Sequence, residues 1–442
     1  MQYAYVPVGV PTFDLDVAQN QFAKSCTLMR QCFGEQAVCP DKMLLSIAEL
    51  KSYLDEIHPN LIIVQNITFA NAAYCSEVVA KFPRTPILLW TLKEPIIDGQ
   101  RLRLNSLTGS YSAANCLRKL GCRNFAYVFG APESAEVKSA ILANAQAVKT
   151  LQEISTCKIA AIGNTPDGFG FGRALDSDVQ RVFGSRLISV EVREILARAK
   201  GYRAEEVQSY IEDFRCTFCD YEVIPEKNLE GYARLMKAYV DFCEENCVKV
   251  IGSRCWPDLF SEFGTPNCAV LSKLNDMGIA CACESDVYGG ISMFIASRLS
   301  GSAVFFGDPV SMDQEQNTVT YWHCGMCPPS LATRPTIGVH PNRKIGPTMD
   351  FGCKACEHVT IFRIGQDENG KFRAFLATGK ALQKPKQFIG ASVVVKTDTN
   401  AKELVNKSVL EGWEPHFVVS YADITESLLA LCRILEIPVQ RF

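Results

Sequence analysis

Three side chains that lie far apart in the sequence have the types that hold a divalent cation and move protons. Glu284 and Asp308 flank a helix-like stretch, and His416 lies near the end of the 442-residue chain. Carboxylate oxygens and an imidazole nitrogen suit Mn²⁺, Mg²⁺, Co²⁺ or Zn²⁺. An ion held by only three protein ligands keeps open positions for another molecule. The trio therefore predicts a catalytic metal site.

Each member of the trio also has an ordinary interpretation. Both carboxylates follow very apolar segments, where an unpaired charge is costly, so salt bridges would equally explain them. Asp286 or Ser285 is suited to cap a helix predicted over 287–299. A lone histidine such as His416 is more often hydrogen-bonded or exposed than bound to a metal. Sequence spacing alone leaves both interpretations open.

Pairs of cysteines offer a rival metal hypothesis, a structural zinc ribbon. The two Cys-x-x-Cys pairs are Cys324 with Cys327, and Cys353 with Cys356. A third pair, Cys216 and Cys219, shows how easily this spacing arises in a chain with 20 cysteines.

Polar and aromatic side chains beside predicted strand ends are candidates for contacting a sugar. Indole rings stack on sugar C–H faces, and Trp256 and Trp413 lie beside polar turns, although either could equally fill a core. Arg254 is expected to face the same crevice at the strand ends as Trp256, and His323 is expected to bind a sugar hydroxyl. The substrate-binding candidates in this group are Arg254, Trp256, His323 and Trp413.

A second polar loop carries two cations. Arg343 and Lys344 have the charge to hold an anionic group such as a sulfonate, or they simply face solvent. The solvent interpretation is slightly favoured on sequence grounds.

Periodic patterns predict the elements that must position these residues. Strand 3–8, helix 14–33 and helix 42–58 open a β-α-β series, which indicates a parallel sheet. A comparable series begins near Cys157, and short strands with turns dominate after residue 302. We therefore expect an α/β fold class with two Rossmann-like parallel-sheet domains, at 1–155 and 156–302, followed by a β-rich, barrel-like C-terminal domain at 303–442.

Composition narrows the class of protein. Apolar residues make up 48% and charged residues 21% of the chain, and the net charge is −3. These values predict a soluble globular protein without a nucleic-acid or membrane partner. The N-terminus lacks the basic segment of a signal peptide, and abundant cysteine in a chain without an export signal indicates reduced thiols. The expected location is the cytoplasm.

Two segments resemble the L-fucose isomerases. The stretch from Glu284-Ser-Asp286 through Leu-Ser-Gly-Ser-Ala to Asp308 is similar to the metal-binding core of that family. The closing segment, from Trp413-Glu-Pro-His416 to Ile-Pro438, resembles the family's terminal segment. The resemblance implies that Glu284, Asp308 and His416 bind Mn²⁺ and that the two carboxylates shuttle the proton. It also implies two α/β domains and a β-rich C-terminal domain.

The resemblance further implies assembly into a homo-oligomer, a trimer or hexamer. Active sites in the family are completed by a neighbouring subunit's N-terminal domain, and here Thr12 and Asp14 are the candidates for that contribution. Pro415 replaces the Asn that normally precedes the histidine, so the family's sugar contacts do not transfer. The chain is also short, like a divergent branch that includes isomerases of other sugars, sulfoquinovose among them.

The predicted function is a metal-dependent aldose–ketose isomerase that acts on a monosaccharide by an enediol proton transfer. The sugar would be fucose-like, arabinose-like or a modified hexose such as sulfoquinovose. Glu284 and Asp308 are the expected base and acid, in an order that the sequence does not assign. The alternatives are a non-catalytic sugar-binding sensor and a structural-zinc protein.

Overall fold

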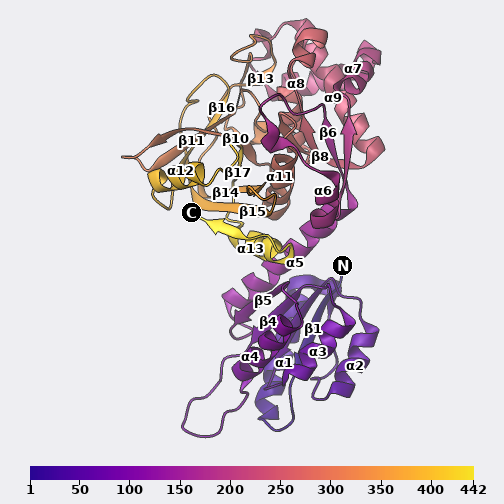
Figure 1. The fold of residues 1–442 in the computed structure, drawn as a ribbon, viewed down its shortest axis with the longest axis vertical. Coiled ribbons are helices and arrows are strands. Elements are labelled where there is room, and N and C mark those ends of the chain that lie inside the picture. The colour runs from indigo at the N-terminus through magenta and orange to yellow at the C-terminus, as the bar shows by residue number, and fades with distance from the viewer. The chain divides into compact units, whose positions relative to one another are not determined.

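The computed structural model describes residues 1–442, and the chain forms two compact units (Figure 1). Unit 1 comprises Met1–Leu151 with Glu426–Ile437, and unit 2 comprises Gln152–Thr425 with Pro438–Phe442. The predicted three-domain division at residues 155 and 302 stays a prediction.

Unit 1 is built on a parallel sheet with strand order β2-β1-β3-β4-β5. Its strands are β1 (Tyr3–Val8), β2 (Ala37–Val38), β3 (Leu61–Asn66), β4 (Ile87–Thr91) and β5 (Phe125–Phe129). Its helices are α1 (Leu15–Phe33), α2 (Ile47–Glu56), α3 (Ala72–Lys81), α4 (Ser106–Lys119), the first part of α5 (Ala135–Thr156) and α13 (Thr425–Ile434).

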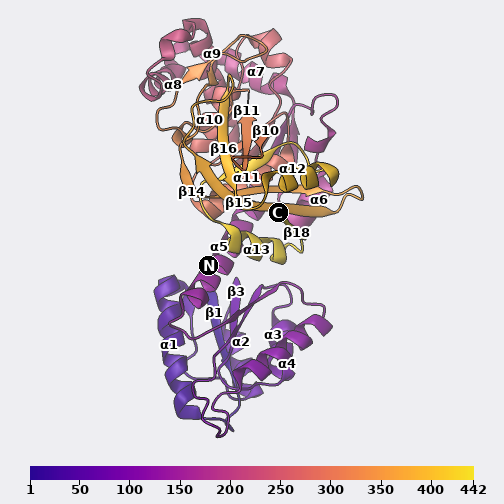
Figure 2. The same ribbon diagram turned by 90° about the vertical axis from the view of Figure 1, so that its left-hand side faces the viewer.

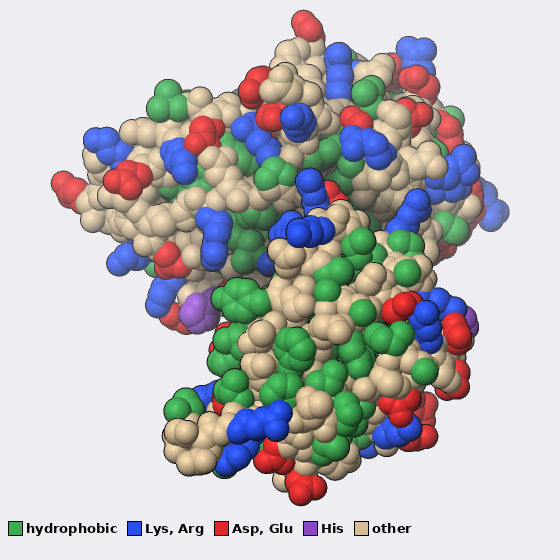
Figure 3. All heavy atoms as spheres, turned by 60° about the horizontal axis from the view of Figure 1, so that its bottom comes forward, with side chains coloured by type: hydrophobic (Ala, Val, Ile, Leu, Met, Phe, Trp, Pro, Cys, Tyr) green, Lys and Arg blue, Asp and Glu red, His purple; other side chains and the backbone are tan.

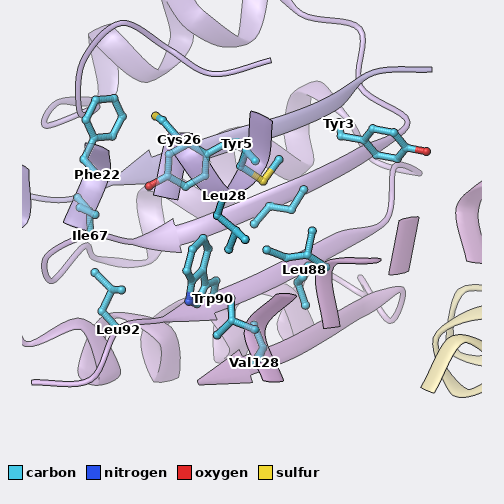
Figure 4. Packing of buried hydrophobic residues seen from close by; sticks show 14 of the residues in the cluster. Tyr3, Tyr5, Phe22, Cys26, Leu28, Ile67, Leu88, Trp90, Leu92 and Val128 are labelled. Carbon is cyan, nitrogen blue, oxygen red and sulfur yellow. The ribbon is translucent and has the colours of Figure 1, made fainter. Parts of the chain in front are cut away.

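The two faces of this sheet carry separate cores. Tyr5, Ile63 and Trp90 pack with α1 and α5, a cluster seen in Figure 4, whereas Val6 and Val64 pack with α2, α3 and α4. Figure 2 shows α1 on one side of the sheet and α3 and α4 on the other. Both faces are covered, as the continuous apolar strands of a parallel sheet require.

The second helix of unit 1 is shorter than the sequence pattern predicts. Leu44 forms a parallel bridge with Val8, and its backbone N–H donates to Pro7 O at 2.9 Å. This extended segment pairs with the sheet, so the helix begins only after Ser46, whose hydroxyl accepts from Glu49 N at 3.3 Å.

Unit 2 contains a second parallel sheet with the order β7-β6-β8-β9. Its strands are β6 (Lys158–Ile162), β7 (Arg186–Val190), β8 (Val248–Ser253) and β9 (Ala280–Cys283). Its helices are α6 (Asp176–Phe183), α7 (Val192–Gly201), α8 (Ala204–Thr217), α9 (Glu226–Asn246), α10 (Cys268–Asp276) and α11 (Val287–Ser300).

Six antiparallel strands of unit 2 close into a barrel in the order β14-β17-β10-β11-β16-β15 and back to β14. These strands are β10 (Phe305–Asp313), β11 (Thr318–His323), β14 (Cys356–Gln366), β15 (Phe372–Leu382), β16 (Ala391–Thr397) and β17 (Phe417–Ser420). The smaller elements are β12 (Ile337–Gly338), β13 (Thr348–Met349), α12 (Ala401–Leu410) and β18 (Val439–Arg441), which adds to β15 in parallel. The predicted fold class, two parallel-sheet α/β parts followed by a barrel, is confirmed.

Helix α11 joins the parallel sheet of unit 2 to the barrel. Every residue from 287 to 296 is buried, and the helix packs against β8 and β9 as well as β14 and β17. A helix that is apolar all round needs such a surrounding. Ser292, a polar exception, accepts a hydrogen bond at 2.9 Å from the backbone N–H of Ile364 in the barrel.

All 20 cysteines are free thiols, and none of the helices is long and apolar enough to cross a membrane. Unit 1 also exposes large apolar side chains, and Figure 3 shows hydrophobic side chains gathered on the face brought forward in that view. The most exposed of them in unit 1 are Ile97 at 90% and Tyr111 at 74%.

Replacing Ile63 by Ala is expected to lower the free energy of unfolding of unit 1 by about 2–5 kcal/mol, because its fully buried side chain would leave a cavity in the core. Urea unfolding followed by circular dichroism measures this. The matched control is Ile97→Ala, which removes the same atoms from an exposed position. Equal effects of the two variants would contradict the assigned core.

Candidate active site

The site begins where β9 ends and α11 starts. Glu284 and Ser285 adopt left-handed backbone angles, with φ of 58° and 56°. Non-glycine residues rarely take this conformation, and it is held only where surrounding contacts fix it. Here the Ser285 hydroxyl donates to Gly163 O at 2.9 Å. A side chain on Gly252 would lie 3.0 Å from the Ser285 backbone, so the bare glycine permits the close approach.

The barrel places Asp308 and His416 next to each other. Gly307 of β10 pairs with Phe417 of β17, so the residues beside them, Asp308 and His416, also stand side by side. His416 Nε2 lies 3.2 Å from Glu284 Oε2 and 3.6 Å from Asp308 Oδ1. The structure thus brings the three residues singled out in the sequence into one cluster.

Asp286 is a central residue of this cluster, beyond the helix cap that the sequence indicated. Its Oδ1 accepts from Gly289 N at 2.8 Å and caps α11. Its Oδ2 lies 2.9 Å from His416 Nδ1. A carboxylate on Nδ1 fixes the ring orientation and leaves Nε2 facing Glu284 and Asp308.

Arg363 holds this carboxylate from behind, and sequence reasoning missed it. Its guanidinium bonds both oxygens of Asp286, at 2.6 and 3.1 Å, and donates to His416 O at 3.0 Å. Glu414 Oε2 lies 3.7 Å from Arg363 Nε. Arg363 and Asp286 are 1% and 0% exposed. The signal in the sequence was one charge within the mostly apolar run 359–365 of strand β14.

The surroundings shift the proton affinities of these groups in different directions. Burial disfavours charge on His416, but its contacts with Asp286, Glu284 and Asp308 raise its pKa to about 10. Burial also works to raise the pKa of Asp286, but Arg363 and His416 outweigh it and hold that pKa well below the usual range. The pKa of Asp308 is raised, chiefly by burial, with His416 opposing the change.

The donor set fits a divalent cation. Ligand atoms at about 2.1 Å and at right angles on one octahedral ion lie about 3 Å apart, near the observed 3.2 and 3.6 Å. Two carboxylates and an imidazole with a carboxylate on its far nitrogen are a usual ligand set. The side chains contact one another, however, and no group of three or more His, Cys, Asp and Glu residues is pre-arranged around a shared centre.

Aromatic rings enclose His416. Phe306 and Phe171 have ring centroids 4.7 and 5.4 Å from its imidazole, and His323, at 6.0 Å, completes the wall. His323 is 2% exposed, and its Nδ1 lies 3.2 Å from the backbone N–H of Cys324. Of the predicted sugar-binding residues, His323 thus lies against the cluster.

The other predicted substrate residues are distributed more widely. Arg254 and Trp256 directly follow β8, whose last residue pairs with the residue before Glu284, so Arg254 lies at the same sheet edge. Trp413 packs beneath Arg373, with 4.1 Å from the guanidinium carbon to the ring centroid, and its indole N–H donates to Gln440 Oε1 at 3.1 Å. Its predicted stacking on a sugar remains untested.

Two candidates belong to unit 1. Asp14 caps α1 by accepting from Val17 N at 3.2 Å, and Thr12 O accepts from Arg101 Nη2 at 2.7 Å. These contacts explain both residues locally. Their predicted contribution to a neighbouring subunit's site stays a prediction.

The thiols of the two Cys-x-x-Cys pairs do not converge, so the structure does not support the zinc-ribbon alternative. Cys327 Sγ lies 3.6 Å from Cys353 Sγ, whereas Cys324 bonds Cys268. Cys356 donates to the backbone oxygens of His358 and Tyr421. A zinc ribbon needs all four thiols around one ion.

Comparison with known families identifies the family to which this chain belongs. Residues 346–442 match the C-terminal domain of L-fucose isomerase, a stretch that contains His416 and Arg363. The chain belongs to the L-fucose isomerase-like family, and the class defined by the fold and its relatives is that of sugar aldose–ketose isomerases.

The similar proteins span the whole chain. A sulfoquinovose isomerase from Clostridium sp. (strain MSTE9) is 52% identical over 442 residues, which cover 99% of this chain and 98% of the relative. Sulfoquinovose isomerases from Priestia aryabhattai and Alkalicoccus urumqiensis are 35% and 32% identical, each over 98% of this chain. The protein is an isomerase, and the non-catalytic sensor is set aside.

Replacing Arg363 by Met is expected to destabilise unit 2 by about 3–5 kcal/mol, because Asp286 would remain buried without its cation. Thermal unfolding measures the effect. The control Arg193→Met removes a guanidinium that is 80% exposed and should change stability by less than about 0.5 kcal/mol. Two equally stable variants would contradict the role given to the buried pair.

Proposed function

We propose that this protein converts sulfoquinovose, a glucose with a sulfonate on C6, to the corresponding 2-ketose. The observation that carries the proposal is the cluster of Glu284, Asp308 and His416 in a chain 52% identical, end to end, to a sulfoquinovose isomerase. Family membership supports the reaction class, and the relatives' shared substrate supports the choice of sugar.

The proposed reaction moves one proton between C2 and C1 and one between the two oxygens. One of Glu284 and Asp308 removes the C2 proton and returns it to C1, and the other carries the hydroxyl proton. Both carboxylates lie within 4 Å of the same imidazole nitrogen, so a sugar fragment bound there meets both. Phe171 and Phe306 keep bulk water from this side of His416.

We propose that Glu284, Asp308 and His416 hold a divalent cation, preferably Mn²⁺, with Mg²⁺, Co²⁺ or Zn²⁺ as alternatives. Such an ion supplies electrostatic stabilisation of negative charge at the sugar's oxygens. Asp286 and Arg363 keep His416 oriented for this task.

We expect the protein with Mn²⁺ to isomerise sulfoquinovose and, in D₂O, to place solvent deuterium on C1 of the ketose, because the transferred proton passes through an exchangeable carboxyl group. Proton and carbon NMR of the product measure this. Ketose without deuterium at C1 would contradict the proton-transfer route.

The same assay tests the catalytic carboxylates. Glu284→Gln should lower kcat by roughly 10²–10⁴-fold, since one proton-transfer step would lose its catalyst. Glu315→Gln, on an exposed turn, is the control with the same chemical change. Full activity of Glu284→Gln would refute the assignment.

Removing the cation with a chelator should abolish activity, and Mn²⁺ should restore it. Asp286→Asn is expected to weaken Mn²⁺ binding by roughly 10–100-fold, because His416 loses its orienting carboxylate. Calorimetric titration of the metal-free protein measures this without any turnover. Asp41→Asn, at an exposed position, is the control, and unchanged affinity in Asp286→Asn would contradict the role of Asp286.

Assembly into a trimer or hexamer with shared active sites, and a cytoplasmic location, remain proposals. The exposed apolar side chains of unit 1, such as Ile97 and Tyr111, and the hydrophobic side chains gathered on the face in Figure 3 support an interface there, because apolar surface is commonly buried by partners.

A further inference from the structure

A sulfonated sugar brings a permanent negative charge to a site that already holds two carboxylates. A cation must therefore meet the sulfonate, and this requirement rests on the proposed function. The buried Arg363 cannot do so, because its guanidinium is committed to Asp286, to the carbonyl of His416 and to Glu414. Within unit 2, recognition of the sulfonate must therefore come from other cations, at the rim of the site.

Arg254 is one such cation. It directly follows β8, whose last residue, Ser253, pairs with Cys283, the residue before Glu284. Asp258 binds only its Nη2, at 2.6 Å, while its Nε is buried and has no hydrogen-bond partner. Buried donors are nearly always satisfied in folded proteins, so an acceptor from a ligand or water would complete this atom, as it would the equally unpaired Nε of Arg363 and Arg373.

Arg343 is the second such cation, and its guanidinium faces the loop that carries Arg254 and Trp256. Its guanidinium carbon lies 5.6 Å from the ring centroid of Trp256, two residues beyond Arg254. The contact of its guanidinium is with this ring rather than with an acidic side chain, so its charge is available. Stacking on an indole orients a guanidinium while leaving its edge donors free for a bidentate anion such as a sulfonate.

The loop that carries Arg343 is anchored to the active site. The backbone N–H groups of Asn342 and Arg343 donate to His340 Nδ1 at 3.2 and 3.3 Å. The His340 imidazole also bonds the thiol of Cys324, the residue after the wall residue His323. These contacts join the backbone of this loop to the wall of the site, while the side chains of Asn342 and Arg343 are exposed.

Another pair of arginines lies near His416 but in unsuitable surroundings. Arg173 and Arg373 line a cavity of about 500 Å³ that shares Phe171 with the site. Four carboxylates line the same cavity, so it disfavours an anion. These four are Asp367, Glu368, Glu411 and Glu414.

We propose that Arg343 and Arg254, gathered at the Trp256 loop, bind the sulfonate of the substrate and set the preference for a sulfonated over a neutral hexose. The sequence had left Arg343 between a sulfonate ligand and a solvent-facing residue. The Arg343 side chain is exposed, as the solvent interpretation expects, and its contact with Trp256 places this exposed charge near the loop of Arg254, whose Nε is unpaired, where an entering anion would meet both.

The test compares kcat/KM for sulfoquinovose and for 6-deoxyglucose in the full-length protein. Arg343→Gln should lower kcat/KM for sulfoquinovose by roughly 10–100-fold through KM, because a charge-assisted bond is lost, and should leave the value for 6-deoxyglucose within about twofold. Arg343→Lys should recover part of the loss. Arg254→Gln should show the same selectivity, and if it fails to fold, Arg343→Gln decides alone.

Two control variants separate a specific contact from general electrostatics. Lys344→Gln removes the adjacent exposed charge, and Arg173→Gln removes a cation of the acidic cavity. An equal loss in Lys344→Gln, or a selective loss in Arg173→Gln with none in Arg343→Gln, would overturn the assignment. Calorimetric titration with sulfoquinovose distinguishes a failure of the proposed function from a failure of the proposed sulfonate subsite. A wild-type protein that neither binds nor converts the sugar refutes the proposed function, whereas conversion unaffected by Arg343→Gln refutes only this subsite.

Discussion

The buried ion pair between Asp286 and Arg363 connects the main parts of unit 2. Its carboxylate caps the central helix α11 and holds His416, while its guanidinium comes from barrel strand β14. Desolvating both charges costs several kcal/mol each, and the four bonds around Asp286 must offset that cost. Such a pair contributes little net stability. Its main effect is to fix one relative placement of helix, strand and imidazole.

The site therefore lies where two architectures meet within one unit. Glu284 comes from the carboxyl edge of a parallel sheet, the usual place for ligands in α/β folds, and Asp308 and His416 come from neighbouring barrel strands. The left-handed backbone at Glu284 and Ser285 turns the first carboxylate toward the other two groups. Sheet register alone would not bring these three residues together. The buried helix α11, packed on both layers, does so.

Local patterns in the sequence predicted much of the fold, because they depend on near neighbours. Most strands of both sheets and the later barrel strands follow from runs of apolar residues and turn residues, whereas the edge strands β2 and β7 were missed. From the sequence, Asp308 was expected to follow an apolar segment rather than to lie within a strand, because the next residues, Pro309, Val310 and Ser311, are exposed and resemble a loop. Pairing with β11 extends strand β10 to Asp313, so Asp308 lies inside a strand.

The site was only half visible in the sequence for the same reason. Glu284, Asp308 and His416 are identifiable by type and by resemblance, but the contact of Arg363 with Asp286 joins residues 77 positions apart. Such a contact depends on barrel closure, which no local pattern reports. Arg343 was ambiguous because its neighbour Trp256 comes from a distant loop.

Asp286 has two structural roles, and they couple ligand binding at the site to the stability of unit 2. Because the same carboxylate caps α11 and orients His416, a molecule that binds the native cluster also favours the folded helix. By mass action, a ligand at 100 times its Kd adds about 2.7 kcal/mol to the native state. The abundance of folded protein in a cell would then follow the supply of its ligands.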